Sequence, residues 1–257
     1  MKIRVLGCYG AQMPGFNTTG FLVDDTMLVD AGTVTKVLSL EEQLAINNVL
    51  ITHGHLDHVQ DLLFLADNLS IANSRTKPVC VISTEDILND LRTHLFNDVI
   101  WPDFSVIPSP EKPVITFKAI TPGVPFVLND LRGTAVSVSH AVNAVSYILE
   151  KDGSMVLFIS DTGPTEDVWK EANRIGTSLK ALFVEVSFPN SMSAMALAAG
   201  HLTPEHLKQE LSKLDVDDIP IFIYHIKPQY REAITEEIGR IQRKNLRIIS
   251  DGDILQV

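Results

Sequence analysis

Short hydrophobic runs recur along the chain and alternate with segments in which hydrophobic residues fall at helical spacing. Runs in which hydrophobic residues alternate with polar ones, or follow one another without a break, predict β-strands. The predicted strands are Lys2–Leu6, Thr19–Val23, Thr26–Val29, Asn48–Thr52, Val79–Ser83, Val114–Ile120, Val124–Val127, Thr134–Ser139, Ser146–Glu150, Met155–Ile159, Ala181–Val184, Pro220–Tyr224, Leu246–Ile249 and Ile254–Val257. The predicted helices are Val34–Ala45, Asp57–Ala72, Glu85–Phe96, Glu166–Arg174, Pro204–Leu214 and Gln229–Arg243.

No linker divides these elements into separate groups. The proline-rich stretch Pro102–Pro113 is the longest predicted loop, and no change of composition accompanies it. Strands and helices that intermix along a chain of this kind predict a layered α/β (α+β) fold in which helices cover both faces of a β-core. We therefore expect one domain spanning residues 1–257.

Composition and charge narrow the classes of function. The chain has 257 residues, 45% of them hydrophobic, and a formal net charge of −11. This charge disfavours binding to long nucleic acids and to anionic membranes, because both need a basic surface. No hydrophobic run is long enough to span a membrane, and the N-terminal residues do not resemble a signal peptide. Cys8 and Cys80 lack metal-binding spacing, so we expect a cytoplasmic protein without a disulfide framework.

Histidines are concentrated in one turn. The segment Thr52–His58 contains three of the eight histidines of the chain, and it follows the predicted strand Asn48–Thr52. His53 and His55 can converge on one metal ion, and Asp57 and His58 can contribute to a second ion close by. A chain of this length needs no structural metal to fold, so a metal bound here is expected to serve chemistry.

Further candidate ligands stand at the ends of other predicted strands. His140 follows Thr134–Ser139, Asp161 follows Met155–Ile159, and His225 follows Pro220–Tyr224. Functional sites of layered α/β folds assemble where strand ends meet at one edge of a sheet. We therefore expect these three residues to join the histidine turn.

The order of these residues resembles the metallo-β-lactamase superfamily, whose pattern is HxHxDH followed by His, Asp and His. The resemblance implies an αββα sandwich, with two mixed sheets flanked by helices, that binds two Zn²⁺ ions, or Mn²⁺ or iron in their place. It implies that one ion is held by His53, His55 and His140 and the other by Asp57, His58 and His225, with Asp161 as a bridge. It also implies a homodimer.

Within the superfamily, the ligand set resembles the phosphodiesterase branch. The segments His53–Val59, Ile100–Phe104 and Gly200–Pro204 are similar to those of class II cyclic-nucleotide phosphodiesterases, although Asp61 stands where that class has a small residue. The expected activity is hydrolysis of 3′,5′-cyclic nucleotides, cyclic AMP or cyclic GMP, to 5′-nucleotides by attack of a metal-bridging hydroxide. The alternatives are a ribonuclease Z-like tRNA 3′-processing endonuclease, another phosphodiesterase of this fold, and a metal-bound scaffold without turnover.

Other residues are assigned on weaker signals. Relatives of the ribonuclease Z type use a Glu/His pair to protonate the leaving oxygen, and Glu185 with His201 could form that pair here. Together with Asp57 these are the expected catalytic residues. Asn17 follows a glycine-punctuated loop and is a candidate for substrate binding. Trp101 and Phe104 could stack on a base or could instead anchor the proline-rich loop or a dimer contact.

Overall fold

Two mixed β-sheets form the centre of the protein in the computed structural model, which describes residues 1–72 and 77–257. Within that part of the chain each sheet has seven strands. The first has the order β16 (Ile254–Gln256), β1 (Lys2–Gly7), β2 (Gly20–Val23), β3 (Met27–Val29), β4 (Asn48–Leu50), β5 (Val79–Ser83) and β8 (Ile115–Ala119). The second has the order β15 (Leu246–Ile248), β14 (Ile221–Tyr224), β13 (Leu179–Glu185), β12 (Ser154–Phe158), β11 (Val145–Lys151), β10 (Leu131–Ser137) and β9 (Phe126–Leu128).

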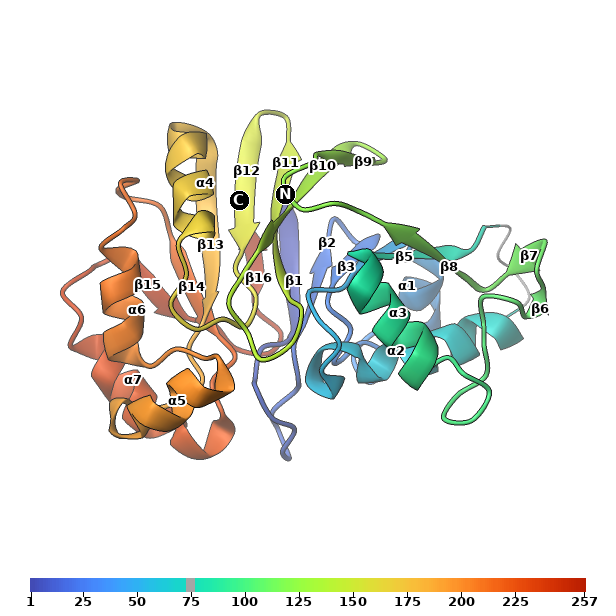
Figure 1. Cartoon of the computed structure of the whole chain (residues 1–257), viewed down its shortest axis with the longest axis horizontal. Helices are drawn as coiled ribbons and strands as arrows, with labels where there is room; N and C mark the ends of the chain where they lie inside the picture. The colour runs from blue at the N-terminus through green and yellow to red at the C-terminus, as the bar shows by residue number, and fades with distance from the viewer. Residues whose placement is uncertain (73–76) are drawn as a thin grey trace.

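Helices lie on the two outer sides of the paired sheets (Figure 1). Beside the first sheet are α1 (Leu40–Ala45), α2 (Leu56–Ile71) and α3 (Glu85–His94). Beside the second are α4 (Asp167–Ile175), α5 (Ser193–Ala199), α6 (Pro204–Leu211) and α7 (Arg231–Gly239). This αββα arrangement confirms the fold class expected from the sequence.

Aromatic side chains join the two sheets in the core. Phe21 of β2 contacts Phe158 of β12 and Phe183 of β13, with ring centroids 5.5 and 5.4 Å apart. Tyr147 of β11 donates a hydrogen bond of 2.8 Å to the carbonyl of Ile51, just after β4. All of these side chains are fully buried. The sheets are therefore held in a fixed relation, which sets the distance between ligands that come from different sheets.

The strands are where the sequence predicted them, with bounds that differ by a few residues at most. The predicted helix Val34–Ala45 is wrong in its first half, because α1 begins only at Leu40 and residues 34–39 form turns. Ser39 caps α1, and Glu42 completes the capping box. One helix and two strands of the described residues were not predicted: α5, and β6 (Pro108–Ser109) with β7 (Lys112–Pro113), which form a short hairpin inside the proline-rich loop.

Strand direction brings the candidate ligands to one edge. Strands β3, β4, β5 and β8 are parallel in the first sheet, and β12 to β15 are parallel in the second. The carboxyl ends of parallel strands lie on the same side, where loops carry functional residues.

None of the helices in residues 1–72 and 77–257 is long and apolar enough to cross a membrane.

Candidate metal centre

The turn between β4 and α2 supplies the first group of ligands. His53 lies just after the strand, and His55 is the N-cap residue of α2, so the chain changes direction between them. Asp57 and His58 are in the first turn of the helix. His53 and His58 are fully buried, and Asp57 keeps 28% of its side chain exposed.

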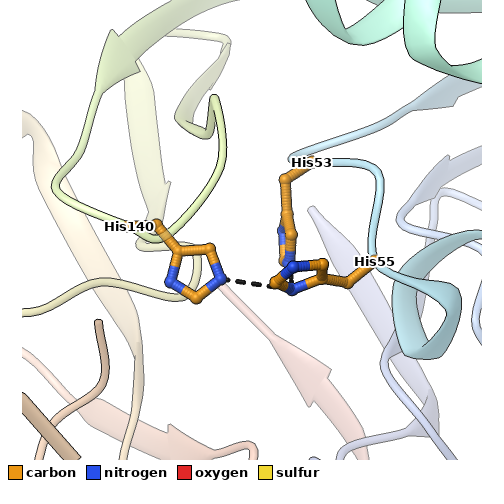
Figure 2. A group of neighbouring side chains, drawn as sticks. All are labelled: His53, His55 and His140. Carbon is orange, nitrogen blue, oxygen red and sulfur yellow. Dashed lines mark hydrogen bonds between the residues drawn. The ribbon is translucent and has the colours of Figure 1, made fainter. Parts of the chain in front are cut away.

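Ligands from the second sheet meet this turn, as expected. His140 follows β10 and its Nε2 lies 3.3 Å from Nδ1 of His55, which in turn is 3.1 Å from Nε2 of His53 (Figure 2). His225 follows β14, with its Nε2 3.0 Å from Nε2 of His58 and 3.3 Å from Oδ2 of Asp57. Two groups of three potential ligand atoms thus form among the described residues, one from His53, His55 and His140 and the other from Asp57, His58 and His225. Three further groups overlap with these two and add Asp161, His201 and Glu185.

Asp161, three residues beyond the end of β12, lies between the two groups. Its Oδ2 is 3.1 Å from Nε2 of His225, 3.3 Å from Nε2 of His58 and 3.7 Å from Nε2 of His53. The residue is buried, and its second oxygen, Oδ1, has no hydrogen-bond partner among the described residues. A buried carboxylate oxygen without a partner is costly unless a cation satisfies it.

The outward nitrogen of four imidazoles already has a partner. Nδ1 of His58 lies 2.7 Å from Oδ2 of Asp30, that of His140 lies 2.8 Å from the Gly200 carbonyl, and that of His225 lies 2.9 Å from Oγ of Ser187. Nδ1 of His53 lies 3.1 Å from Oγ1 of Thr52, whose hydroxyl donates to Asp30.

These partners assign the imidazole protons to Nδ1. In a neutral imidazole that carries its proton on Nδ1, the inward Nε2 keeps a lone pair that can bind a cation. His55 instead turns Nδ1 inward, 3.1 Å from Nε2 of His53 and 3.3 Å from Nε2 of His140. Lone pairs converge in this way on a cation, and histidine with carboxylate is a donor set that zinc and similar ions prefer. The residues therefore fit the metal ions that the sequence implies.

Burial and charge set the protonation of the cluster. Burial, reinforced by neighbouring imidazoles, lowers the pKa of His53 well below its ordinary value and also lowers that of His55. Burial acts in the same direction on His58, but the carboxylates of Asp161 and Asp30 hold the pKa of that imidazole well above its ordinary value. The pKa of Asp161 is held well below its ordinary value, since the surrounding imidazoles outweigh burial. Asp161 therefore stays anionic.

The predicted pair of Glu185 and His201 lies against the cluster. Glu185 ends β13, is fully buried, and its Oε1 accepts a hydrogen bond of 3.0 Å from Nδ1 of His201. The ring of His201 stacks on that of His225 at a centroid distance of 5.5 Å. Burial lowers the pKa of His201, but the Glu185 carboxylate outweighs burial and raises it. Carboxylate, imidazole and metal ligand thus form one contiguous group.

The sequence interpretation missed several residues that hold the ligands. Asp30 follows β3 with a left-handed φ of 59°, and its carboxylate accepts from His58 and Thr52. A buried aspartate directly after a strand is a signal that could have identified it. Ser187 donates 3.0 Å to Oε2 of Glu185 while it contacts His225. Nothing in the sequence distinguishes this serine. The backbone of His225, like that of Asp30, is in the left-handed region, with a φ of 64°.

Asn17 and Trp101, two candidates for substrate binding, donate side-chain hydrogen bonds to backbone carbonyls and not to residues of the cluster. The amide of Asn17 donates to the Leu6 carbonyl at 3.2 Å. The indole of Trp101 donates to the Leu63 carbonyl at 3.0 Å, and its ring contacts Phe64. These contacts favour the interpretation that Trp101 anchors the proline-rich loop to α2.

The position of Phe104 favours the second interpretation, that it anchors the loop, over base stacking. Its side chain is 3% exposed and belongs to the hydrophobic core, so neither face of the ring is open to a nucleobase. The backbone of Phe104 bonds to Val114 and Ile115, which fixes the loop at the start of β8. Phe104 therefore serves packing.

Comparison with known families decides the assignment of the chain. A model of the β-lactamase superfamily domain matches residues 26–222, the larger part of the chain. The chain belongs to this superfamily. The match covers the histidine turn, His140, Asp161 and the Glu185–His201 pair, whereas His225 lies three residues beyond its end.

Relatives with phosphodiesterase names are similar over much of the chain. A probable 3′,5′-cyclic-nucleotide phosphodiesterase of Yersinia pestis is 28% identical over 211 residues, which cover 74% of this chain and 59% of that protein. A 3′,5′-cyclic-nucleotide phosphodiesterase of Aliivibrio fischeri is 27% identical over 296 residues, covering 96% of this chain and 86% of that protein. A ribonuclease Z of Methanopyrus kandleri is 28% identical over 158 residues, covering 58% of this chain and 50% of that protein.

Solved structures agree on the fold of this superfamily member. Unliganded yeast PDE1 superimposes with a TM-score of 0.84 at 20% sequence identity, covering 100% of this chain and 99% of that one. At this identity the similarity concerns the fold. The two mixed sheets are thus an architecture that this chain shares with yeast PDE1.

Proposed function

We propose that this superfamily member is a dinuclear zinc phosphodiesterase that hydrolyses 3′,5′-cyclic nucleotides to 5′-nucleotides. The observation that carries the proposal is the position of Asp161 between two groups of three ligand atoms, which suits a pair of ions sharing one carboxylate. The phosphodiesterase names of the Yersinia pestis and Aliivibrio fischeri relatives support the choice of substrate.

Each ligand has a place in this proposal. One ion would be held by His53, His55 and His140, the other by Asp57, His58 and His225, and both by Asp161. When bound, two such ions supply a water-derived nucleophile at neutral pH and neutralise charge on a phosphoryl oxygen. Mn²⁺ or iron would suit the same histidine and carboxylate donors.

His201 is proposed to protonate the 3′-oxygen that leaves the phosphorus. Its Nδ1 donates to Glu185, so Nε2 is the nitrogen available to carry a proton toward the substrate. Glu185 holds the ring through its Oε1 and is itself fixed by the backbone N–H of Leu202 at 3.1 Å. A leaving alkoxide needs a proton because it is a strong base, and a positioned acid typically contributes about 10²–10⁴-fold.

A substitution at His201 tests this acid role. His201→Ala is expected to lower kcat for cyclic AMP by about 10²–10⁴-fold with metal content unchanged. A nitrophenyl phosphodiester, whose leaving group needs no proton, should lose far less. Equal losses on both substrates would exclude His201 as the acid. Glu185→Gln, which keeps the shape of the side chain but removes its charge, should show the same pattern more weakly.

The activity itself is tested by measuring turnover of four substrates side by side. Cyclic AMP and cyclic GMP are expected to be hydrolysed to 5′-nucleotides, while a tRNA precursor and a lactone are not. Processing of the tRNA precursor without turnover of cyclic nucleotides would replace the proposal with the ribonuclease Z alternative, toward which the Methanopyrus kandleri relative points. Metal-loaded protein that turns over none of them would be a binding scaffold.

A further inference from the structure

A cavity of about 680 Å³ opens beside the candidate metal centre. Its wall includes His140 and the residues that lead from β10 to β11, and its other side is formed by the start of α3. Asp90 of this helix lies next to the histidine turn, since a Cβ built on Gly54 would be 3.9 Å from Cβ of Asp90. The cavity is therefore continuous with the place where a scissile phosphate would lie.

The lining of this cavity is acidic. Asp86 and Asp90 are four residues apart on α3, so they project from the same face of the helix, and both are exposed. Among the described residues that line the cavity none is lysine or arginine. Thr84 and Asn143 add uncharged hydrogen-bonding groups, and Pro122 and Val142 add apolar surface.

Size and chemistry together indicate the kind of group that fits. Cavities of about 300–1,000 Å³ lined by apolar surface with a few polar groups are typical small-molecule sites. Carboxylates accept hydrogen bonds from N–H groups, as an exocyclic amine or ring N–H of a base would provide. The same carboxylates repel a phosphate group, and no cation in the lining offsets that repulsion.

We infer that this cavity binds the uncharged nucleoside part of a substrate that carries a single phosphate, and that Asp86 and Asp90 exclude substrates with a further phosphate. The inference rests on the proposed phosphodiesterase function, because it places one phosphate at the metal centre and the nucleoside beside His140. It deepens that function by naming what distinguishes an accepted phosphodiester from a rejected one. A binding site can reject a ligand with a second phosphate by placing an unpaired negative charge where that phosphate would lie.

Two ligands that differ by one phosphate test the inference. We would measure the dissociation constants of adenosine 5′-monophosphate and adenosine 2′,5′-bisphosphate for the metal-loaded protein by calorimetry. In the Asp86→Asn/Asp90→Asn variant, the ratio of the two constants should shift by about 3- to 30-fold in favour of the bisphosphate. The shift should shrink when the salt concentration is raised from about 0.02 M to about 0.5 M, because salt screens exposed charges.

A matched control separates the effect of charge in the cavity from the effect of the net charge of the protein on the binding ratio. Asp217→Asn/Asp218→Asn removes two exposed charges from the loop before β14, which does not line this cavity, so it should leave the ratio unchanged. An unchanged ratio in the Asp86→Asn/Asp90→Asn variant, or an equal shift in the control, would overturn the inference. Failure of the proposed function would show separately, as absence of cyclic-nucleotide turnover by the unmodified protein, since the binding ratio requires no turnover.

Discussion

At the scale of single residues, the site is organised by groups that do not touch substrate or metal. Asp30, Thr52 and Ser187 each hold the outward nitrogen of an imidazole, directly or through a hydroxyl. Such partners orient metal-binding histidines and fix which nitrogen carries the proton. The folded chain therefore holds these candidate ligands in place through bonds to its own residues.

Asp161 is expected to affect both groups of ligands when it is removed. Asp161→Ala should hold at most one equivalent of metal where the unmodified protein is expected to hold two, because the carboxylate contacts histidines of both groups. Asp57→Ala is the matched comparison and should lose one ion, since the side chain of Asp57 contacts His225 and His58, which both belong to the second group. Metal analysis of the purified variants gives the answer, and full metal content with normal activity in Asp161→Ala would refute the bridging role.

Ser187 is expected to act as a positioning residue for His225. Ser187→Ala leaves Nδ1 of His225 without its nearest partner, and loss of such a partner typically weakens metal affinity by about 10–100-fold. Titration with a competing chelator measures this affinity independently of activity. Ser187→Thr keeps the hydroxyl and should restore most of the affinity. If the alanine and threonine variants bind metal equally well, the serine only fills space.

At the scale of elements, α2 is fastened to the loop that carries Asp30. The buried side chain of Asp61 accepts hydrogen bonds from the backbone N–H groups of Val34 and Thr35 at 2.7 and 2.8 Å. The backbone N–H of Asp61 donates to Ala31 at 2.9 Å. A small residue at this position could not make the two side-chain bonds. The departure from the class II pattern thus has a structural role that leaves the metal ligands unchanged.

Loss of this connection should lower the stability of the fold. Asp61→Ala leaves two backbone N–H groups without their acceptor, and each such group costs about 1–3 kcal/mol, so a loss of about 2–6 kcal/mol in the free energy of unfolding is expected. Urea denaturation measures it. Asp61→Asn, which retains one acceptor oxygen, should lose less, and Asp67→Ala on the same helix should lose little. A loss below about 0.5 kcal/mol for Asp61→Ala would show that solvent replaces the carboxylate.

Elements that are defined by local pattern could be predicted from the sequence. The strands that precede His140, Asp161 and His225 are hydrophobic runs, so the strands and the order of the candidate ligands that follow them could both be predicted from the sequence. The first half of Val34–Ala45 was misassigned because its hydrophobic residues fit helical spacing while Asp61, distant in sequence, holds a turn there. The Ser39–Glu42 capping box marked the correct start of α1.

What the sequence did not show depends on contacts between distant segments. Ser187 meets His225 only because β13 and β14 are neighbours in the sheet. The burial of Phe104 likewise follows from tertiary packing that no local pattern encodes. The cavity between α3 and the end of β10 joins residues that are more than 40 positions apart.

At the scale of the whole molecule, the net charge of the protein makes RNA a less favourable substrate than a cyclic nucleotide. The net charge of −11 and the acidic cavity leave little that would attract a polyanion outside the metal centre. The chains that process tRNA must hold several phosphates at once, which needs a basic surface. The negative charge of the protein should therefore repel an RNA substrate over most of the length of the RNA.

A salt titration of binding checks this expectation. Cyclic-nucleotide affinity should change little with salt, with a slope of log K against log salt of about one or less in magnitude, because a single phosphate is neutralised. A tRNA precursor should bind weakly at every salt concentration. Tight tRNA binding with a steep slope would contradict the expectation and would indicate a basic surface that the net charge conceals.

The left-handed backbone of His225 has a consequence for how this protein can change over evolutionary time. A side chain with a Cβ at such a φ costs about 1–2 kcal/mol relative to a glycine, which adopts the conformation freely. The chain nevertheless carries an imidazole there, 3.0 Å from that of His58. A glycine at this position would relieve the backbone cost but would remove the imidazole, so a substitution that favours stability here would cost the protein a candidate metal ligand.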